Sequence, residues 1–397
     1  MKIYLTSIIS ILAVILPLYA QETLTWESDG YSLKALPDSV YCVEITGYNG
    51  NQTELHIPDS FRREGVKYAV SSIGRQAFYY NRNLREVILP DGLTSIAMMA
   101  FTGCRNLQTI VLPESVANID PYAFTETDVK TIVVPDCVKT LNYAAFQNIP
   151  SLNTLVLGKR VRHIGEIALA QLSGLKELYI LSPEIPEIGQ DTTPFYDALC
   201  SEATVYVPSE LLSQYPVRPE DSRNIKQSIF HDFEDGWSYF YNYKPVPDLF
   251  TVFYKDSYSM EAGESIQILY ESINYKGVEV YSTEWICDDE NVATVSDGYI
   301  TGNKAGTTKG RIKVRTNNGV FTSGDFNITV TGSEVDNGPR KTRANGSQSK
   351  PSLVPYGVVS AEYYSLDGIF LGSDIENLEP GIYIEKTKEA SRKITVQ

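Results

Sequence analysis

Residues 72–90, SIGRQAFYYNRNLREVILP, decide the fold because their pattern returns along the chain. A large apolar residue marks each copy, at Phe78, Phe101, Phe124, Phe146 and Leu169, with spacings of 23, 23, 22 and 23 residues. An alanine precedes each marker, and an isoleucine or leucine lies four residues before that alanine. Each marker then leads into an apolar run of the form L-x-x-L-x-L. Such a run at this period is typical of a leucine-rich solenoid.

Alternation within the apolar run assigns its side chains to two sides of a sheet. Leu84, Val87 and Leu89 are expected to point inward, as are Leu107, Ile110 and Leu112 in the next copy. One repeat cannot bury this face alone, so stacked repeats must share one core. The marker residues should therefore line up inside a common stack.

The positions between the inward residues are expected to form two outward columns across five repeats. An apolar stripe of this kind often marks a protein-binding surface. The other interpretation is that β-branched residues suit strands and stack on one another. We predict a ligand-binding sheet face made of Glu86, Ile88, Thr109, Val111, Thr131, Val133, Thr154, Val156, Glu177 and Tyr179.

The copies SIGRQAF…NLREVILPDGL and SIAMMAFTGCRNLQTIVLPESV resemble the BspA-type leucine-rich repeat family of bacterial surface proteins, over roughly residues 41–229. Members of that family are mostly extracellular binding or adhesion proteins, and the resemblance implies the same role here. The segment ITGYNGNQTELHIP resembles the start of the family's arrays, and its Asn49-Gly50 pair predicts a hairpin. The segment ATVYVPSELLSQYP resembles the terminal repeat, with a last strand at 205–208 and Ser209 capping a short helix.

Two further modules follow the repeats. The string WICDDENVATVSDGYITGNKAGTTKGRIKV resembles the bacterial immunoglobulin-like group 2 module, a common spacer or adhesive unit, and Trp285 should fill its centre. Asp288, Asp289 and Glu290 lack the spacing of a calcium loop and predict a solvated turn. The tail YSLDGIFL…LEPGIYIEK…KITVQ resembles a C-terminal sorting module of secreted proteins from gram-negative anaerobes, with a hairpin at Asp367-Gly368. An accessory β-module is the alternative.

The expected fold is mainly β: a leucine-rich repeat solenoid, an immunoglobulin-like β-sandwich and a small C-terminal β-module. The expected segments are a signal peptide at 1–20, an N-terminal cap at 21–69, the solenoid with its terminal cap at 70–229, an aromatic linker at 230–248, the immunoglobulin-like domain at 249–331, a disordered linker at 332–352 and the C-terminal module at 353–397.

The net charge limits the classes of partner that the protein can bind, and the N-terminal apolar run indicates its location. The chain has 34 Lys and Arg against 49 Asp and Glu, a net charge of −15, which repels nucleic acid. The apolar run from Ile8 to Leu16 is too short to span a membrane and reads as a secretory signal cut before Gln21. No other long apolar run predicts a transmembrane segment. We expect a secreted or cell-surface protein of a gram-negative bacterium.

Five scattered cysteines predict neither a disulfide scaffold nor a zinc site. By repeat register, Cys104 and Cys137 are expected to point inward as small apolar side chains. The aromatic segment 230–243 reads as packing between domains, with a sugar-binding platform as the alternative.

No catalytic motif is present: the three histidines lie far apart, and H-E-x-x-H, G-x-S-x-G and phosphate-loop patterns are absent. We predict no catalytic residues, no metal site and no cofactor. The expected function is non-catalytic binding or adhesion, with an extracellular protein or glycan, host-derived ligands included, held on the sheet face. The alternatives are a structural spacer of the cell envelope without a ligand and, less favoured, an enzyme with an unrecognised site.

Overall fold

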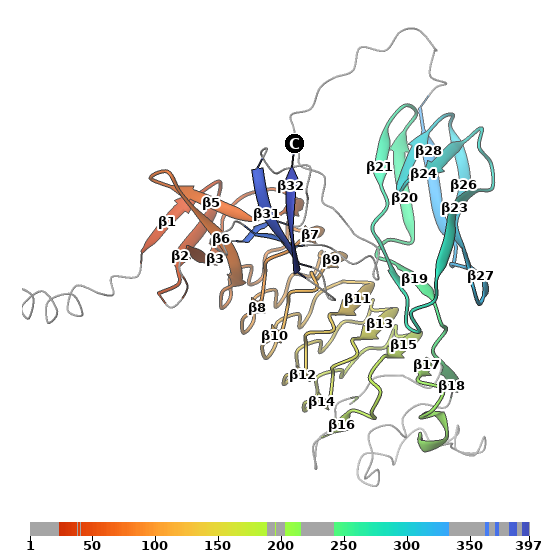
Figure 1. Cartoon of the computed structure of the whole chain (residues 1–397), viewed down its shortest axis with the longest axis horizontal. Helices are drawn as coiled ribbons and strands as arrows, with labels where there is room; N and C mark the ends of the chain where they lie inside the picture. The colour runs from red at the N-terminus through yellow and green to blue at the C-terminus, as the bar shows by residue number, and fades with distance from the viewer. Residues whose placement is uncertain are drawn as a thin grey trace, which may run out of the picture. The chain divides into compact units, whose positions relative to one another are not determined.

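The computed structural model describes residues 24–37, 39, 41–188, 195, 203–215 and 242–332, and the backbone of four strands nearer the C-terminus (Figure 1). The chain folds as two compact units, Met1–Pro247 and Asp248–Gln397. The described residues are almost all strand and turn, with one short 3-10 helix. The expected fold class, a leucine-rich repeat solenoid followed by β-domains, is confirmed.

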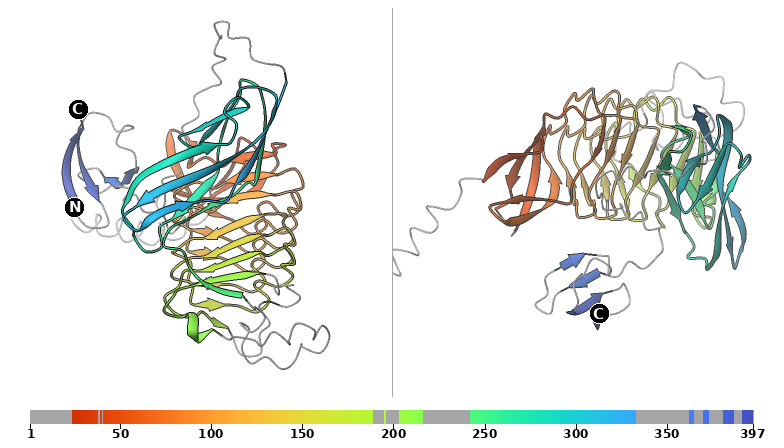
Figure 2. Two further views of the ribbon diagram at one scale, coloured as in Figure 1. Left: turned by 90° about the vertical axis from the view of Figure 1, so that its right-hand side faces the viewer. Right: turned by 90° about the horizontal axis from the view of Figure 1, so that it is seen from above.

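The first unit is a solenoid whose successive coils contribute strands to a main sheet and to a second sheet (Figure 2). All pairings between successive coils are parallel. The main sheet contains β4 (Glu54–His56), β7 (Glu86–Ile88), β9 (Thr109–Val111), β11 (Thr131–Val134), β13 (Thr154–Leu157), β15 (Glu177–Ile180), β17 (Thr204–Val207) and β18 (Asn242–Pro245). The second sheet contains β6 (Val66–Ile73), β8 (Ser95–Ile96), β10 (Asn118–Ile119), β12 (Thr140–Leu141), β14 (His163–Ile164) and β16 (Glu187–Ile188).

The repeat markers form a spine inside the solenoid, as predicted. Phe78, Phe101, Phe124 and Phe146 stack in succession, with ring centroids 4.9, 5.5 and 5.4 Å apart and planes within 4° of parallel. Leu169 is fully buried with them. Each phenylalanine amide donates to the carbonyl of the alanine that precedes the next marker, at 2.8–3.0 Å. Only a small residue leaves room for this close approach, which explains the invariable alanine.

Each coil turns sharply at two positions beside the spine, where the backbone enters the left-handed region. This conformation costs an ordinary residue free energy, and a β-branched residue most of all. The first position is occupied by Gln76, Met99, Tyr122, Ala144 and Ile167, and the second by Tyr80, Gly103, Glu126, Asn148 and Gln171, all with φ between 44° and 74°. Stacking on neighbouring coils therefore imposes the turn whichever residue the sequence supplies.

Both sheets are interrupted at the coil that is one residue short. The ladders β4–β7–β9 and β11–β13–β15–β17–β18 are separate, and so are those of β10 and β12. The missing residue lies after Phe124, which is 5 residues from Val129, whereas Phe101 is 6 from Leu107. The ladder interruption and the shortened turn thus coincide, while the spine continues through them.

The N-terminal cap consists of β1 (Thr25–Ser28), β2 (Tyr31–Ala35), β3 (Cys42–Tyr48) and β5 (Ser60–Arg63). The hairpin predicted at Asn49-Gly50 is wrong: β3 pairs with β2 and β6, whereas β4 pairs with β7 of the main sheet. The chain turns a corner of the solenoid at this point instead of reversing. The hairpin joining β1 and β2 is at Asp29-Gly30, where both residues have positive φ, as a tight hairpin turn requires.

The strand expected at 205–208 is β17, which begins and ends one residue earlier. The chain then continues into the 3-10 helix Leu212–Gln214. Ser209 does not cap that helix; its hydroxyl donates to the Glu210 carboxylate at 2.9 Å. Strand β18 then adds a further parallel strand beside β17, and Tyr243 packs on Tyr215 with ring centroids 5.1 Å apart. The rest of the aromatic segment, 230–241, lies outside the described residues.

The second unit contains short strands around two apolar clusters. Its strands are β19 (Phe250–Phe253), β20 (Ser257–Glu261), β21 (Ser265–Gln267), β22 (Tyr270–Ile273), β23 (Val280–Cys287), β24 (Ala293–Ser296), β25 (Tyr299–Gly302), β26 (Gly306–Thr316), β27 (Gly319–Thr322) and β28 (Phe326–Thr331). Trp285 is half-buried and packs against both clusters, with its ring 5.2 Å from that of Tyr270. It lies between the clusters rather than at the centre of one.

Four strands of the C-terminal segment form a sheet: β29 (Glu362–Tyr364), β30 (Phe370–Gly372), β31 (Gly381–Lys386) and β32 (Ser391–Val396). Strand β29 pairs antiparallel with both β30 and β31. The stretches EYY and GIYIEK therefore lie side by side in this sheet, and β31 also pairs antiparallel with β32. The predicted signal peptide at 1–20, the predicted hairpin at Asp367-Gly368 and the predicted linker at 333–352 lie outside the described residues.

Candidate functional site

The predicted outward residues lie in register along the main sheet. In one column Ile88 is beside Val111, and Val133 is followed by Val156 and Tyr179. In the other column Glu86 is beside Thr109, and Thr131 is followed by Thr154 and Glu177. The inward residues of the same strands belong to the solenoid's core cluster, whereas none of these ten does. We call this surface the strand face.

The strand face is longer than predicted, because the terminal strands extend both columns. Glu54 and His56 precede them, Thr204 and Tyr206 follow, and β18 adds Asn242 and Lys244. The first four lie in the quoted motifs TELHIP and TVYVP, where the same alternation was available to sequence reasoning. Asn242 and Lys244 had no such signal, since β18 joins the sheet after a long excursion of the chain.

The middle of the strand face is less exposed than an outward column suggests. Val111, Val133, Val156 and Tyr179 are only 7%, 5%, 0% and 7% exposed, although they are not in the core cluster. Glu86, Thr109 and Thr131 are also buried, and Ile88, Thr154 and Glu177 are half-buried. The ends are open, because Glu54, His56, Asn242 and Lys244 are exposed. Solvent therefore reaches this face mainly at its two ends.

Burial and hydrogen bonds shift the pKa values of side chains at the C-terminal end of the strand face. Tyr179 stacks on Tyr206 with ring centroids 4.4 Å apart and planes within 8° of parallel. The Thr154 hydroxyl lies 3.5 Å from a Glu177 carboxylate oxygen. Burial raises the pKa of Glu177 above its ordinary value, and hydrogen bonds from Thr154 and Tyr179 oppose that rise. Burial likewise raises the pKa of Tyr179. This end presents aromatic rings beside a carboxyl group.

At the N-terminal end, the His56 Nε2 atom lies 3.8 Å from a Glu86 carboxylate oxygen, with the histidine half-exposed and the glutamate buried. The two ends thus differ in character: an imidazole with a carboxylate at one, stacked tyrosines with Lys244 at the other. Together they place polar groups around an apolar column.

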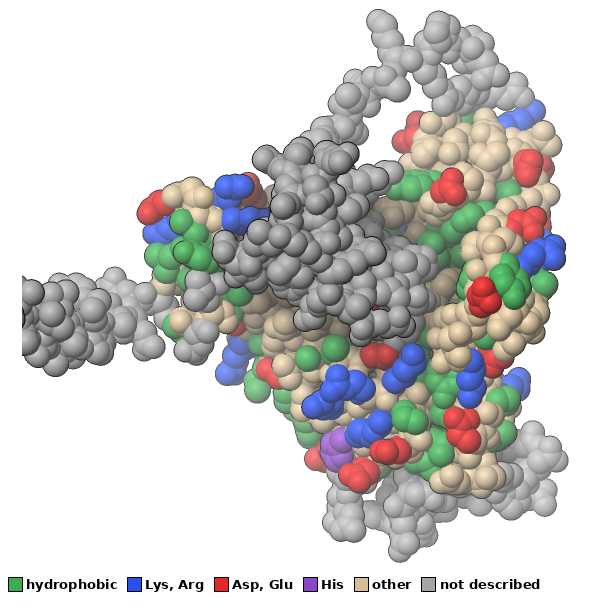
Figure 3. Space-filling view, in the orientation of Figure 1, with side chains coloured by type: hydrophobic (Ala, Val, Ile, Leu, Met, Phe, Trp, Pro, Cys, Tyr) green, Lys and Arg blue, Asp and Glu red, His purple; other side chains and the backbone are tan. Residues whose placement is uncertain are grey.

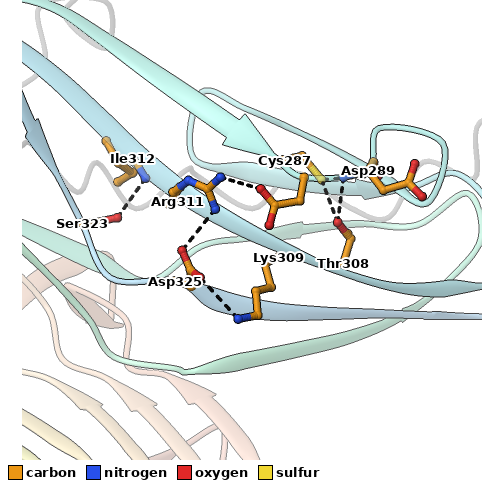
Figure 4. A network of polar contacts seen from close by, with 9 residues as sticks. Cys287, Asp289, Thr308, Lys309, Arg311, Ile312, Ser323 and Asp325 are labelled. Carbon is orange, nitrogen blue, oxygen red and sulfur yellow. Dashed lines mark hydrogen bonds and ion pairs between the residues drawn. The ribbon is translucent and has the colours of Figure 1, made fainter.

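The acidic turn of the second unit is engaged in structural contacts (Figure 4). Arg311 bridges Asp288 and Asp325, and Lys309 also contacts Asp325 at 3.4 Å. Asp289 accepts hydrogen bonds from the amide and side chain of Asn291, both at 3.0 Å, while its own amide donates to Thr308. These contacts are those of the predicted turn. Across the described ranges, no group of three or more His, Cys, Asp or Glu side chains is arranged to hold a metal ion.

The comparisons bear on the solenoid. Residues 71–198 match the model of the BspA type leucine rich repeat region in six copies. This part of the chain is a BspA-type leucine-rich repeat region. Proteins with such repeats are generally non-catalytic and are typically secreted or held at the cell surface. Among the described residues, no helix has the length and apolar character needed to span a membrane.

Several solved structures resemble the chain. A T. pallidum leucine rich repeat protein is 26% identical, with 39% of this chain and 71% of that chain covered and a TM-score of 0.36. The pneumococcal vaccine antigen PcpA is 21% identical, with 49% and 45% covered and a TM-score of 0.38. A Bacteroides ovatus leucine-rich repeat protein is 18% identical, with 46% and 70% covered and a TM-score of 0.25. The comparison with curated proteins gives no match.

Proposed function

We propose that the protein binds an extracellular protein or glycan on the strand face without catalysing a reaction. The observation that carries this proposal is the apolar column of Ile88, Val111, Val133, Val156 and Tyr179, which lies in register but outside the solenoid's core cluster. The middle of this column is already buried, so the apolar area that a partner can bury is at its partly exposed ends, Ile88 and Tyr206. The repeat type supports a binding role as well.

We place the binding at the two open ends of the strand face. Tyrosine and arginine dominate interface energetics because they bury a large area and still form hydrogen bonds. Tyr206 is half-buried and stacked on Tyr179, so it offers a rigid aromatic edge. Ile88 is half-buried next to exposed His56 at the other end. A ligand that spans the face would meet both.

The test uses substitutions at half-exposed positions. Aspartate at Val133 or Val156 would bury a charge, because these side chains are 5% and 0% exposed. Such a variant could lose binding simply because it unfolds, so it would not test the site. We therefore choose Ile88→Asp with Tyr206→Ala. The control is Tyr79→Ala with Tyr143→Ala, which removes two exposed tyrosines elsewhere on the solenoid.

The full chain is presented to extracellular-matrix proteins and to a glycan array. We expect a reproducible ligand whose capture falls by about tenfold or more in the strand-face variant, since two anchor residues are lost, and persists in the control. Capture that is unchanged in the folded strand-face variant places the site elsewhere. If neither the matrix proteins nor the glycan array gives reproducible binding, the alternative function, a structural spacer without a ligand, is favoured.

We further propose that residues 249–331 are an immunoglobulin-like spacer, that 353–397 is a sorting module, and that residues 1–20 are a cleaved export signal. The antiparallel pairing of β23 with β26 and of β26 with β28 supports the first. N-terminal sequencing of exported protein should begin at Gln21. A mature chain that still carries residues 1–20 would contradict the signal assignment.

A further inference from the structure

A basic cluster lies where two adjacent coils turn from the main sheet to the second sheet. The amides of Arg162 and His163 both donate to the carbonyl of Lys139, at 2.8 and 3.3 Å, so Lys139 and Arg162 occupy the same position in adjacent coils. Lys159 and Arg160 precede Arg162 in its coil. We call these four residues the basic patch. Figure 3 shows Lys and Arg side chains gathered on the lower coils of the solenoid.

The basic patch is only partly neutralised by the protein. Arg162 contacts the Glu184 carboxylate at 3.0 Å, and Lys159 lies 3.9 Å from that of Asp136. Lys139 and Arg160 are exposed and form no ion pair within the described part of the chain. Lys139 and Arg162 place like charges at the same position of adjacent coils, and like charges side by side reduce stability. In a chain of net charge −15, this positive surface is not explained by folding and suits an anionic ligand.

The surroundings of the basic patch indicate the class of that ligand. Thr140 and His163 lie side by side in the neighbouring column, both half-buried, and offer hydroxyl and imidazole groups. The apolar side chains next to these residues in the chain, Leu141, Val161 and Ile164, are fully buried. The patch therefore lacks the apolar centre on which protein partners depend. Hydrogen-bonding groups beside free cations match a sugar that carries a carboxylate.

Acidic side chains at the border of the patch limit the size of the ligand. Asp136 and Glu184 contact its cations, and Glu187 lies beside His163 in the ladder. A long, uniformly charged polyanion would meet these carboxylates, whereas one carboxylate on an otherwise neutral glycan would not.

We propose that Lys139 and Arg160 bind the carboxylate of an acidic sugar, with Thr140 and His163 bonding its hydroxyl groups. This site shares no residue with the strand face, so either proposal can fail without the other. The probe pair is sialyllactose and lactose, which differ by the acidic sugar, and binding to the full chain is measured by titration calorimetry. Polyglutamate serves as the acidic-peptide probe.

The expected result is binding of sialyllactose about tenfold or more tighter than lactose, because charge-assisted hydrogen bonds are the strong ones. The variant Lys139→Ala with Arg160→Ala should lose this preference. The control, Lys67→Ala with Arg82→Ala, removes the same charge from exposed positions in the first unit and should keep it. Equal binding of both sugars, no binding at millimolar concentration, or an unchanged preference in the patch variant would overturn the proposal. Tighter binding of polyglutamate than of sialyllactose, lost in the same variant, would assign the patch to acidic peptides instead.

Discussion

Phe124 and Phe146 stack with ring centroids 5.4 Å apart and planes within 1° of parallel, although the coil between them is one residue shorter than its neighbours. Phe101 and Phe124, a full period apart, are related in the same way at 5.5 Å and 3°. The shortened turn is absorbed where the sheet ladders are interrupted. Packing of the spine, rather than continuity of the ladders, therefore keeps the coils in register.

Replacing Phe124 with alanine should destabilise the protein strongly. The side chain is fully buried between two other rings, so its removal leaves a cavity and costs roughly 3–5 kcal/mol. Phe124→Leu should cost less, because Leu169 occupies the same position in the fifth copy. The free energy of unfolding, from urea titration followed by circular dichroism, measures both. Tyr143→Ala, at a position 37% exposed, is the control and should change stability by less than about 0.5 kcal/mol.

The period and the alternation predicted the core because both follow directly from burial. Every inward position assigned in the first two copies is buried, and so is every marker. Turn chemistry was less informative. Asn49-Gly50 predicts a hairpin, yet the chain turns a corner there, since β4 pairs with β7 of the main sheet. The long-range parallel pairing of β4 with β7 overrides the local turn preference. The residues around Asn49 do not indicate that pairing.

Replacing Ile167 with asparagine should stabilise the solenoid. Ile167 has φ of 44°, which crowds a β-branched side chain, whereas asparagine tolerates this region and already occupies it at Asn148. Relief of the strain should raise the free energy of unfolding by about 1 kcal/mol, less the loss from burying a smaller apolar side chain. Urea titration measures the change. Glu166→Asn, on an exposed neighbour with ordinary backbone, is the control. Equal effects from the two substitutions would show that the turn is not strained.

Cys104 and Cys137 were both expected to point inward from their positions in the repeat, but they differ in burial. Cys104 is fully buried and its sulfur contacts the Phe78 carbonyl at 3.0 Å, as predicted. Cys137, for which the same prediction was made, is only half-buried and lies outside the core cluster. Cys137 follows the strand at the corner that also holds Ser115 and Arg160, where the coil meets solvent. The position of Cys137 within the repeat did not by itself indicate that it lies at a solvent-facing corner.

Cys104 should resist thiol reagents in the folded protein. Burial raises its pKa to about 12, so at pH 8 only roughly one thiol in ten thousand is ionised, and the reagent cannot reach it. Cys137 should react first. Labelling with a maleimide, followed by peptide mass spectrometry with and without urea, distinguishes the two. Rapid labelling of Cys104 without urea would mean that the coil around it opens readily.

Burial was the property of the strand face that the sequence could not supply. Alternation separates inward from outward side chains, and it placed all ten predicted residues outside the core cluster. It does not say how much solvent an outward side chain meets. The low exposure of Val133 and Val156 changes which substitutions test the face. Burial also raises the pKa of Glu177 at the C-terminal end of the face.

Glu177→Gln should make the protein more stable near pH 7 and change little at low pH. Burial raises the pKa of Glu177 above its ordinary value of 4.5, so the folded state holds the proton more tightly than the unfolded chain does. The wild-type carboxylate therefore reduces stability above the raised pKa. That penalty fades as the pH falls through the raised pKa and is gone below 4.5. Urea midpoints of both proteins between pH 4 and 8 measure the difference, with Glu166→Gln as the exposed control. A difference that stays constant with pH would show that the glutamine acts through packing, and one of opposite sign would show that the hydrogen bonds from Thr154 and Tyr179 outweigh burial.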